Sequence, residues 1–594
     1  MATPVHRRGT LSTKTVLKRL GSRRRLAVGA AGLLLAVGAL AGHVRAAGSA
    51  GEVLYNGIRL PSTWPPQPDQ LTLDPVPAPY LEGPPAVIPI DVGRQLLVDD
   101  FLIEQTTLKR TFHPAEYHSA NPVLEPDKPW EHEGSRPGAC AMPFSDGVWY
   151  DPQDRLFKMW YMGGYVYHTC YATSRDGIHW EKPELDVRPG TNVVDAPRDL
   201  ERFGKDQTQY HDSCTVWLDL EEKDPQKRYK MALFTPVTRN GALSVFYSPD
   251  GIHWKQVGRT GNCGDRSTMF YNPFRKVWVY SLRDYWQPKI EGKLRRFRRY
   301  REGRDLVAAT ANWKVRTDVN LWFVLDRIDA RRVDLDPDHI GLYNLDAVAY
   351  ESVMLGLFSI LQVGPRDDPD RPKINEVFVG FSRDGWHWHR PFERPLIPVS
   401  DHRGDWNWGN VQSAGGCCLV VGDKLYFYVS GRAGKRPGID SKEAVCSTGL
   451  ATLRRDGFAS MDADSTEGTL TTRPVRFSGR YCFVNADVDT GELRVEILDA
   501  EGRVIQPFSR ANCVAVRSDS TLQAVTWPGA SDLSTLAGQT VRFRFYLTNG
   551  GLYAFWVSPD RSGASHGYVA AGGPGFTGPT DTVGLAAYRE AWPQ

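Results

Sequence analysis

Short apolar strands alternate with tight turns through the middle of the chain. Apolar stretches such as 170–173 and 377–381 lead into the motif Ser-x-Asp-Gly, and a Trp follows three residues after the Gly, at 174–180, 248–254 and 382–388. Asp-Gly between two strands is a strong hairpin signal, because glycine tolerates the positive φ that such turns need. The three copies therefore predict β-hairpins that recur along the chain.

Two weaker copies extend this repeat to five. Gly303-Arg304-Asp305 and Arg455-Asp456-Gly457 follow similar strands, so the turns recur roughly every 70 residues. Each turn is preceded by an apolar strand, a turn and an aromatic-rich strand, as at 148–161. Five units of four strands predict a five-bladed β-propeller over residues 91–460, and we expect segment 94–104 to supply the strand that closes the ring.

A different pattern begins after residue 460. Residues 461–594 contain alternating segments such as 481–488, 492–499 and 541–547, separated by turn residues. Alternation with a period of two is typical of strands that bury one face. The predicted fold class is therefore all-β, with a five-bladed β-propeller followed by a β-sandwich domain over residues 461–594.

The first 46 residues have the order of an export signal. A basic stretch ends at Arg25, an apolar run covers 26–42, and small residues surround Ala46. This order predicts a secretory signal peptide, and the adjacent arginines favour the twin-arginine type. An uncleaved N-terminal anchor is the alternative, and it is the only membrane attachment that we expect. Residues 47–90 are Pro-rich and predict an extended linker.

The composition is that of a soluble globular protein with a mildly acidic body. Hydrophobic residues make up 41%, charged residues 24%, and nine of the 72 Lys and Arg lie in residues 1–46 without any Asp or Glu. This balance argues against nucleic-acid binding, so we interpret the basic run 293–301 as an exposed strand of blade three. The nine cysteines include no Cys-x-x-Cys pair. We expect buried thiols, with one or two disulfides as the alternative in an exported protein.

Three carboxylates occupy the same position ahead of successive inner strands. Asp212, Asp265 and Asp346 each lie four residues before an apolar strand residue. Glycoside hydrolysis needs one carboxyl to protonate the leaving oxygen and a second to attack or to activate water. The three aspartates are therefore the candidate catalytic residues, although acids in these places could also cap strands or pair with Arg.

Two further acids are weaker catalytic candidates. Glu351 lies five residues beyond Asp346, on the opposite face of a regular strand, so it would act only if that strand bulged. Asp146 is two residues out of register, and we interpret it as an ordinary Asp-Gly turn.

Polar and aromatic residues near these acids could bind a sugar. The segment 405–412 concentrates Trp, Asn and Gln, which can stack on a sugar ring or bind its hydroxyl groups; packing of the blade is the alternative. No cofactor is expected. The run 334–339 lacks the glycine and distal Glu of an EF-hand, so we interpret it as a surface loop, with a structural Ca²⁺ as the alternative. The candidate substrate-binding residues are Glu133, Arg136, His211, Arg266, Asn344, Trp408, Asn410 and Gln412.

Several parts of the chain carry a resemblance to a known family. These parts are the turns described above, the segment 121–131, the inner strands HDSCTVW and GDRSTMF, and the terminal sandwich. They resemble the five-bladed glycoside hydrolases of the fructosidase and arabinanase clans. The chain looks closest to bacterial proteins labelled glycosyl hydrolase family 32-like, over residues 91–594. That resemblance implies a first-blade Asp as nucleophile, an Arg-Asp-Pro Asp as stabiliser and a Glu-Cys Glu as acid. Asp212 and Asp265 match the second position by spacing, whereas the first-blade Asn-Asp-Pro-Asn and the Glu-Cys motifs are absent.

We therefore expect an exported glycoside hydrolase that acts on an oligo- or polysaccharide through a carboxylate pair. A non-catalytic carbohydrate-binding propeller is one alternative. The other is a glycoside phosphorylase, in which His211, Arg136 and Arg266 would bind phosphate. We also expect Asp212, Asp265 and Asp346 to face one cavity, roughly 5–10 Å apart, with at least one raised pKa.

Overall fold

The computed structural model describes residues 51–134, 138–197, 211–237, 240–285, 288–329, 340–363, 371, 373–391, 393–433 and 445–591. The chain divides into two units, Met1–Ser49 and Ala50–Gln594. The predicted signal over residues 1–46 lies outside the described residues. Among the helices that are described, none is both long and apolar enough to cross a membrane.

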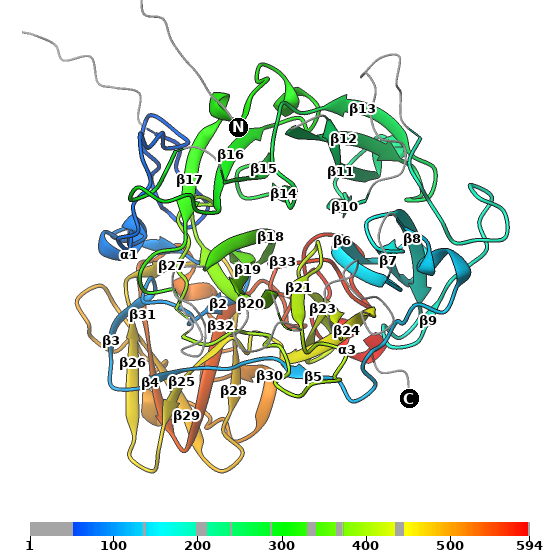
Figure 1. Cartoon of the computed structure of the whole chain (residues 1–594). Coiled ribbons are helices and arrows are strands. Elements are labelled where there is room, and N and C mark those ends of the chain that lie inside the picture. The colour runs from blue at the N-terminus through cyan, green and yellow to red at the C-terminus, as the bar shows by residue number, and fades with distance from the viewer. Residues whose placement is uncertain are drawn as a thin grey trace, which may run out of the picture. The chain divides into compact units, whose positions relative to one another are not determined.

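Five β-sheets surround a common axis in the second unit, as predicted for a five-bladed propeller (Figure 1). In the first three blades, four strands pair antiparallel in chain order, so the first strand of each blade is the innermost. Blade one holds β6 (Ala141–Asp151), β7 (Leu156–Gly163), β8 (His168–Ser174) and β9 (Trp180–Glu181). Blade two holds β10 (Cys214–Leu218), β11 (Tyr229–Val237), β12 (Asn240–Ser248) and β13 (Lys255–Arg259). Blade three holds β14 (Thr268–Asn272), β15 (Val277–Asp284), β16 (Phe297–Gly303) and β17 (Asn320–Val324).

The last two blades recruit strands from distant parts of the chain. In blade four, β18 (Gly341–Glu351), β19 (Val353–Val363) and β20 (Lys373–Ser382) are joined on the inner edge by β33 (Tyr568–Val569). In blade five, β21 (Asn410–Ser413) and β22 (Leu419–Val421) both pair with β23 (Lys424–Arg432), which pairs with β24 (Cys446–Arg454). The outer strand of blade five is β5 (Glu116–Tyr117), so the chain closes the ring with an N-terminal strand.

The prediction that segment 94–104 closes the ring is wrong. Its residues instead form β2 (Gln95–Leu96) and begin β3 (Ile103–Thr106), and both strands pair within the sandwich. The apolar residues Leu97, Phe101 and Leu102 explain this choice, because they are buried in the sandwich core.

The sandwich consists of two antiparallel sheets. One sheet contains β30 (Asp519–Val525), β28 (Tyr481–Asp487), β32 (Gly550–Ser558), β25 (Ala459–Ala463), β4 (Lys109–Phe112) and β2. The other contains β29 (Glu492–Leu498), β31 (Arg542–Thr548), β26 (Gly468–Thr472) and β3, and β1 (Ile88–Pro89) pairs with β27 (Val475–Arg476). The helices are short: α1 (Pro79–Glu82), α3 (Leu585–Ala591), and the 3-10 turns η1 (Pro129–His132), η2 (Pro225–Lys227), η3 (Ala308–Thr310), η4 (Arg316–Asp318), η6 (Arg510–Asn512) and η7 (Ser534–Leu536).

Residues 51–90 pack against the two domains and do not form the extended linker that their Pro content predicts. Leu54, Ile58 and Tyr80 are buried in the sandwich core. Asn56 Nδ2 donates a hydrogen bond to the carbonyl of Arg383 in blade four, at 2.9 Å. The apolar residues between the prolines therefore decide the conformation of this segment.

The Ser-x-Asp-Gly turns dock each blade on its neighbour. Asp250 Oδ1 accepts hydrogen bonds from the amides of Ile252 and His253, both at 2.8 Å, and Gly251 has a φ of 80°. Trp160 of blade one donates its indole N–H to the Gly251 carbonyl at 2.7 Å. The same carboxylate-to-amide bonds recur at Asp176 and Asp384.

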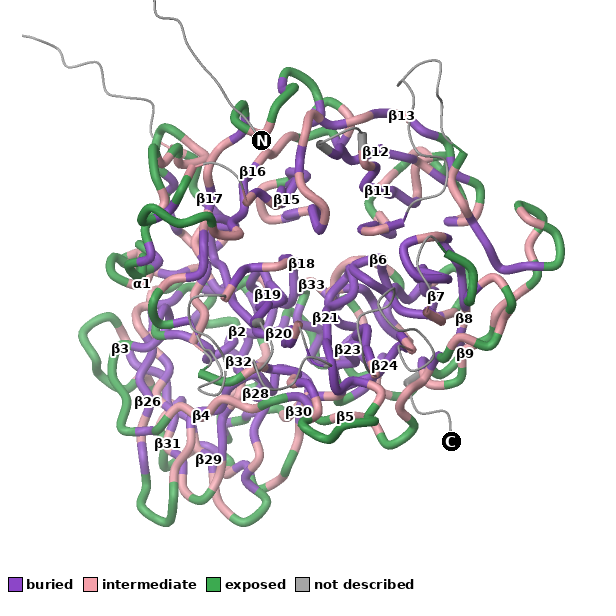
Figure 2. Tube along the Cα trace, in the orientation of Figure 1, coloured by how far each residue is buried: buried purple, intermediate pink, exposed green. Residues whose placement is uncertain are grey.

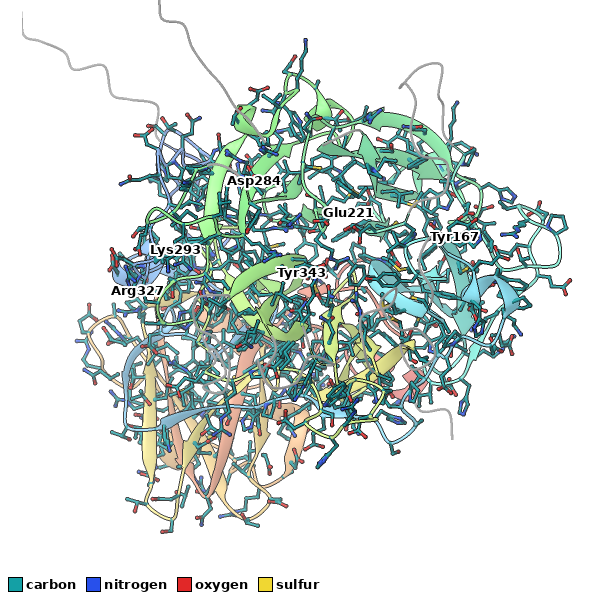
Figure 3. All side chains as sticks on the ribbon, in the orientation of Figure 1. Tyr167, Glu221, Asp284, Lys293, Arg327 and Tyr343 are labelled. Atoms are coloured by element: carbon teal, nitrogen blue, oxygen red, sulfur yellow. The ribbon has the colours of Figure 1, made fainter. Side chains whose placement is uncertain are left out.

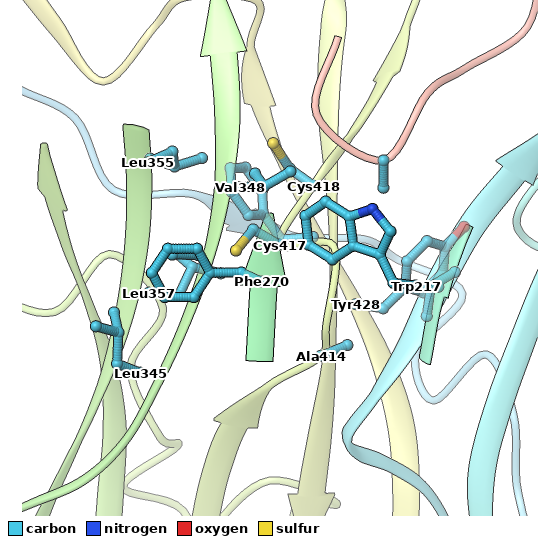
Figure 4. Packing of buried hydrophobic residues seen from close by; sticks show 14 of the residues in the cluster. Trp217, Phe270, Leu345, Val348, Leu355, Leu357, Ala414, Cys417, Cys418 and Tyr428 are labelled. Atoms are coloured by element: carbon cyan, nitrogen blue, oxygen red, sulfur yellow. The ribbon is translucent and has the colours of Figure 1, made fainter. Parts of the chain in front are cut away.

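Buried residues line the strands of every blade (Figure 2). Around the axis, Trp217, Phe270, Val348 and Cys418 come from four different blades and belong to one apolar cluster (Figure 4). All nine cysteines are buried and unpaired, as expected for thiols that serve as small apolar side chains.

Candidate active site

Asp346, on β18, is buried at the centre of a polar cluster that it forms with Asn344, Ser145 and Ser413. We call this set the Asp346 cluster. Asp346 is 3% exposed. Its Oδ2 accepts hydrogen bonds from Ser413 at 2.5 Å, Asn344 at 2.9 Å and Ser145 at 3.1 Å. Its Oδ1 has no hydrogen-bond partner among the described residues. Burial raises the pKa of Asp346 to about 6, against the opposing effect of the Ser413 hydrogen bond. A carboxyl with this pKa can hold a proton close to neutral pH.

Asp146 lies beside this cluster, which corrects its interpretation as an ordinary turn. It is part of β6, where the register shifts between Met142 and Gly147, and it is completely buried. His211 Nε2 lies 2.7 Å from Asp146 Oδ1, and His211 Nδ1 lies 2.8 Å from Thr169 Oγ1. Burial raises the pKa of Asp146, with His211 acting in the opposite direction. The extra residues of the bulge change the direction of the strand, so Asp146 reaches the cluster from outside the expected register.

Arg266 connects these carboxyls. It is fully buried and donates hydrogen bonds to Ser145 Oγ at 2.8 Å and to the Phe144 carbonyl at 2.9 Å. Burial lowers the pKa of Arg266. The charges of Asp346, Asp212 and Asp146 oppose that shift, so all three carboxylates act on one guanidinium.

The other two predicted aspartates are more exposed than Asp346. Asp212 is half-buried. Burial raises the pKa of Tyr165 and of Tyr343, and the charge of Asp212 adds to both shifts. Asp265 has a side chain that is 35% exposed and forms an ion pair with Arg283. Its charge also adds to the raised pKa of Tyr343, which belongs to β18 and is labelled in Figure 3. The electrostatic links therefore connect the three aspartates through Arg266 and Tyr343, while their catalytic roles stay predictions.

Glu351 belongs to a different site, on the opposite face of β18 as the regular strand predicts. Its carboxylate is fully buried and forms ion pairs with Arg94 at 3.4 Å and Arg455 at 3.1 Å. Arg94 also pairs with Asp456 at 2.8 Å, and Arg455 also pairs with Asp581 at 3.1 Å. These five charged residues join blades four and five to the segments that flank the sandwich strands, so Glu351 has a structural position.

The predicted sugar-binding residues divide between the Asp346 cluster and other places. Asn344 belongs to the cluster, Arg266 bonds to it, and His211 bonds to the neighbouring Asp146. Gln412 directly precedes the cluster residue Ser413 in the chain, and its Nε2 donates a hydrogen bond to Asn410 Oδ1 at 2.7 Å. Trp408 is buried under Arg371, whose guanidinium carbon lies 5.4 Å from its ring, which favours packing of the blade.

Two predictions lie at the start of blade one. Glu133 is 43% exposed at its side chain and lies 3.2 Å from Nε2 of the buried His168, which also contacts Asp195. Arg136 lies outside the described residues, as does the run 334–339, which we interpret as a surface loop. Across the residues that are described, no cluster of three or more His, Cys, Asp or Glu could hold a metal ion.

Arg298 was missed by sequence analysis. The basic run that contains it does contribute to β16, but the prediction of an exposed strand is wrong for Arg298 and Arg299, which are 0% and 4% exposed. Arg298 donates to the carbonyl of Arg266 at 2.8 Å and to that of Ser281 at 2.7 Å. Burial lowers its pKa to about 9, although Asp346 acts to raise it. No signal in the run distinguished the buried arginines from the exposed ones.

No family model matches the chain, and no curated protein matches it. Among solved structures, the chain is similar to a glycosyl hydrolase from Bacteroides ovatus, at 13% identity and a TM-score of 0.38, over 61% of this chain and 97% of the other. A structure described under the GH130 family of mannoside phosphorylases, which contains hydrolases of β-1,2-mannosidic linkages in Candida mannan, has 15% identity, a TM-score of 0.37 and coverages of 59% and 97%. A thermostable family-43 glycoside hydrolase has 10% identity, a TM-score of 0.37 and coverages of 53% and 90%. These are likenesses in fold, and the five-bladed propeller itself follows from the strand pairing given above.

Proposed function

We propose that this protein hydrolyses a glycosidic bond in an oligo- or polysaccharide, with Asp346 as the proton donor and Asp212 as the partner carboxylate. The observation that carries this proposal is the state of Asp346. It is buried, its pKa is raised to about 6, and Oδ1 is not used by any hydrogen bond among the described residues. A carboxyl in such surroundings is suited to give a proton to a leaving oxygen.

The reaction then follows the two-carboxylate scheme. Asp346 transfers its proton to the glycosidic oxygen as the bond to the anomeric carbon breaks. Asp212 either attacks that carbon, to form an ester that water later hydrolyses, or removes a proton from an attacking water. We propose Asp146 and His211 as positioning residues, because His211 bonds to Asp146 and directly precedes Asp212 in the chain.

The test is a screen on plant and microbial glycans, followed by Asp346→Asn and Asp212→Asn on the glycan that is cleaved. Loss of a general acid typically costs about 10²–10⁴-fold in rate. Asp519→Asn, where the sandwich strand β30 pairs with Arg454 of blade five, is the matched control and should leave kcat unchanged. Full activity of Asp346→Asn would refute the assignment of the proton donor.

Two other outcomes would select the alternative functions. Glycan binding without turnover, unchanged by both substitutions, would select a non-catalytic carbohydrate-binding propeller. Release of a sugar 1-phosphate that requires inorganic phosphate would select a phosphorylase.

We also propose that the protein is exported, on the basis of residues 1–46. Expression with Arg23→Lys and Arg24→Lys should retain the protein inside the cell if the twin-arginine signal is used. N-terminal sequencing of the exported form should begin near Ala47. A chain that stays in the cytoplasm with residues 1–46 intact would contradict export.

A further inference from the structure

Three arginines and three aromatic rings alternate along the side of the Asp346 cluster. We call this set the arginine ladder. Arg432 lies between Tyr165 and Phe144, with its guanidinium carbon 5.4 and 5.1 Å from the two ring centres. Arg266 lies 3.5 Å from the Phe144 ring and 5.6 Å from the Tyr343 ring, and Arg296 lies 5.9 Å from Tyr343. Cation–ring contacts within about 6 Å are attractive, so the ladder holds the guanidinium groups in place.

The rings of the ladder do not belong to the main propeller core. Phe144 and Tyr165 form a separate apolar cluster near Cys140 and Cys446, and Tyr343 packs against it. This cluster connects blade one with blade five, and Tyr343 extends it to blade four. Arg266 and Arg296 precede strands β14 and β16 of blade three, so the ladder touches four blades at the end of the propeller where Asp212 and Asp346 lie.

The arginines of the ladder form no direct ion pair within the described part of the chain, although the charges of Asp346, Asp212 and Asp146 act on Arg266. Among the described residues, no Asp or Glu lies within ion-pair distance of Arg266, Arg296 or Arg432, whereas the buried Arg94, Arg383 and Arg455 are all paired. Arg432 is only 8% exposed, its Nε is buried, and the described residues supply no acceptor for it. A buried charge without a partner is costly, which points to an anion that binds there.

The two ends of the ladder are more open than its centre. Arg266 is fully buried and already donates to Ser145 and Phe144. Arg296 and Tyr343 are half-buried, and Arg432 keeps a small exposed surface. An incoming anion would therefore contact Arg432 or Arg296, while the buried Arg266 between them attracts it with its positive charge.

We propose that the arginine ladder binds the carboxylate groups of an acidic saccharide, so that the substrate is a uronate-containing glycan. This inference rests on the proposed function of the Asp346 cluster. Guanidinium groups bind carboxylates in a two-pronged geometry, and aromatic faces suit the apolar faces of sugar rings. Three arginines without a direct ion pair, spread over blades three and five, fit a chain with repeated charges better than they fit a single free anion. The charge of Asp212 contributes to the raised pKa of both Tyr165 and Tyr343, so Asp212 lies near two rings of the ladder. The bound carboxylate would therefore lie next to the proposed catalytic residues.

The experiment measures binding to the Asp346→Asn protein, so that turnover does not interfere. Isothermal titration compares an oligogalacturonate and an oligoglucuronate with their carboxyl-reduced forms and with inorganic phosphate. We expect at least one acidic oligosaccharide to bind 10-fold or more tightly than its reduced form, and its affinity to fall with added salt. Arg432→Gln and, separately, Arg296→Gln should each remove most of that preference.

Arg510→Gln is the matched control, because Arg510 lies 4.5 Å from the Tyr546 ring on the sandwich, far from the ladder in the fold. It should bind as the unsubstituted protein does. If Arg432→Gln fails to fold, the half-buried Arg296 still provides the test. Equal binding of acidic and reduced oligosaccharides would overturn the inference, and so would binding of phosphate alone.

The outcomes also separate this inference from the proposed function. Selective binding of an acidic glycan without cleavage of any glycan would support the ladder and refute the hydrolase. Cleavage of neutral glycans, with no preference for acidic ones, would support the hydrolase and refute the ladder.

Discussion

Ser145 of blade one donates a hydrogen bond to Asp346 of blade four, at 3.1 Å between Oγ and Oδ2. These blades are not neighbours in the ring, so the bond connects inner strands across the axis. Ser145 Oγ also accepts a hydrogen bond from Arg266 at 2.8 Å. One hydroxyl therefore links the proposed proton donor to a buried cation, and both contacts favour the ionised carboxylate.

The pH dependence of activity should report the proton on Asp346. Because a general acid must be protonated, activity should fall as pH rises through about 6. Ser413→Ala removes a 2.5 Å hydrogen bond that stabilises the carboxylate, so the pKa should rise and the alkaline limb should move to higher pH. The measurement is kcat against pH for both proteins.

Ser430→Ala is the matched control for this shift. Ser430 is buried in the same blade and donates to the Gln412 carbonyl, without a contact to Asp346. Its pH profile should equal that of the unsubstituted protein. An alkaline limb that stays in place in Ser413→Ala would show that another group controls the activity.

Stability should also depend on pH through Asp346. The folded pKa of about 6 exceeds the unfolded value of about 3.9, so the folded state binds more protons between these limits. The contribution of Asp346 to stability is therefore complete below about pH 4 and is lost as pH rises to about 6, by roughly 3 kcal/mol. Asp346→Asn should remove this decrease. Urea unfolding of both proteins from pH 4 to 7 checks it, and parallel curves would contradict the pKa.

Much of the fold follows from sequence, whereas parts of the cluster do not. The Asp-Gly turns predicted the blades, because each turn carries its own carboxylate-to-amide bonds. Register counting located Asp346, since β18 pairs regularly from Asn344 onward. It failed at Asp146, because a bulge in β6 changes which residue faces the cluster. The ring closure was misplaced because the closing strand β5 is only Glu116–Tyr117 and has no apolar pattern, whereas the apolar residues of 94–104 belong to the sandwich core.

Glu351 should matter for stability and not for chemistry. Both carboxylate oxygens accept hydrogen bonds, Oε1 from Arg455 and Oε2 from Ser565 and the Arg94 amide. In Glu351→Gln, the amide NH₂ must face one of these donors, so we expect a loss of about 3 kcal/mol in unfolding free energy. The kcat of the folded protein should be unchanged.

Glu104→Gln provides the comparison for Glu351. Glu104 is 35% exposed and pairs with Arg542 at 2.8 Å, so its loss should cost less than about 1 kcal/mol. Chemical denaturation measures both variants. Similar losses would mean that the buried network contributes no more than a surface pair.

Gly251 should be the most sensitive position in the second Ser-x-Asp-Gly turn. Its φ is 80°, and a Cβ there would lie 2.4 Å from Cζ2 of Trp160. Trp160 is fully buried and donates its indole N–H to the Gly251 carbonyl, so it cannot move aside without breaking that bond. Gly251→Ala should therefore lower the free energy of unfolding by about 3 kcal/mol, from backbone strain and overpacking together.

Gly190→Ala is the matched control. Gly190 has a φ of 78°, but a Cβ added there would meet no atom within 4 Å, so its loss of unfolding free energy should be about 1 kcal/mol. Urea unfolding followed by Trp fluorescence measures both, and equal losses would show that the turn does not depend on its contact with blade one.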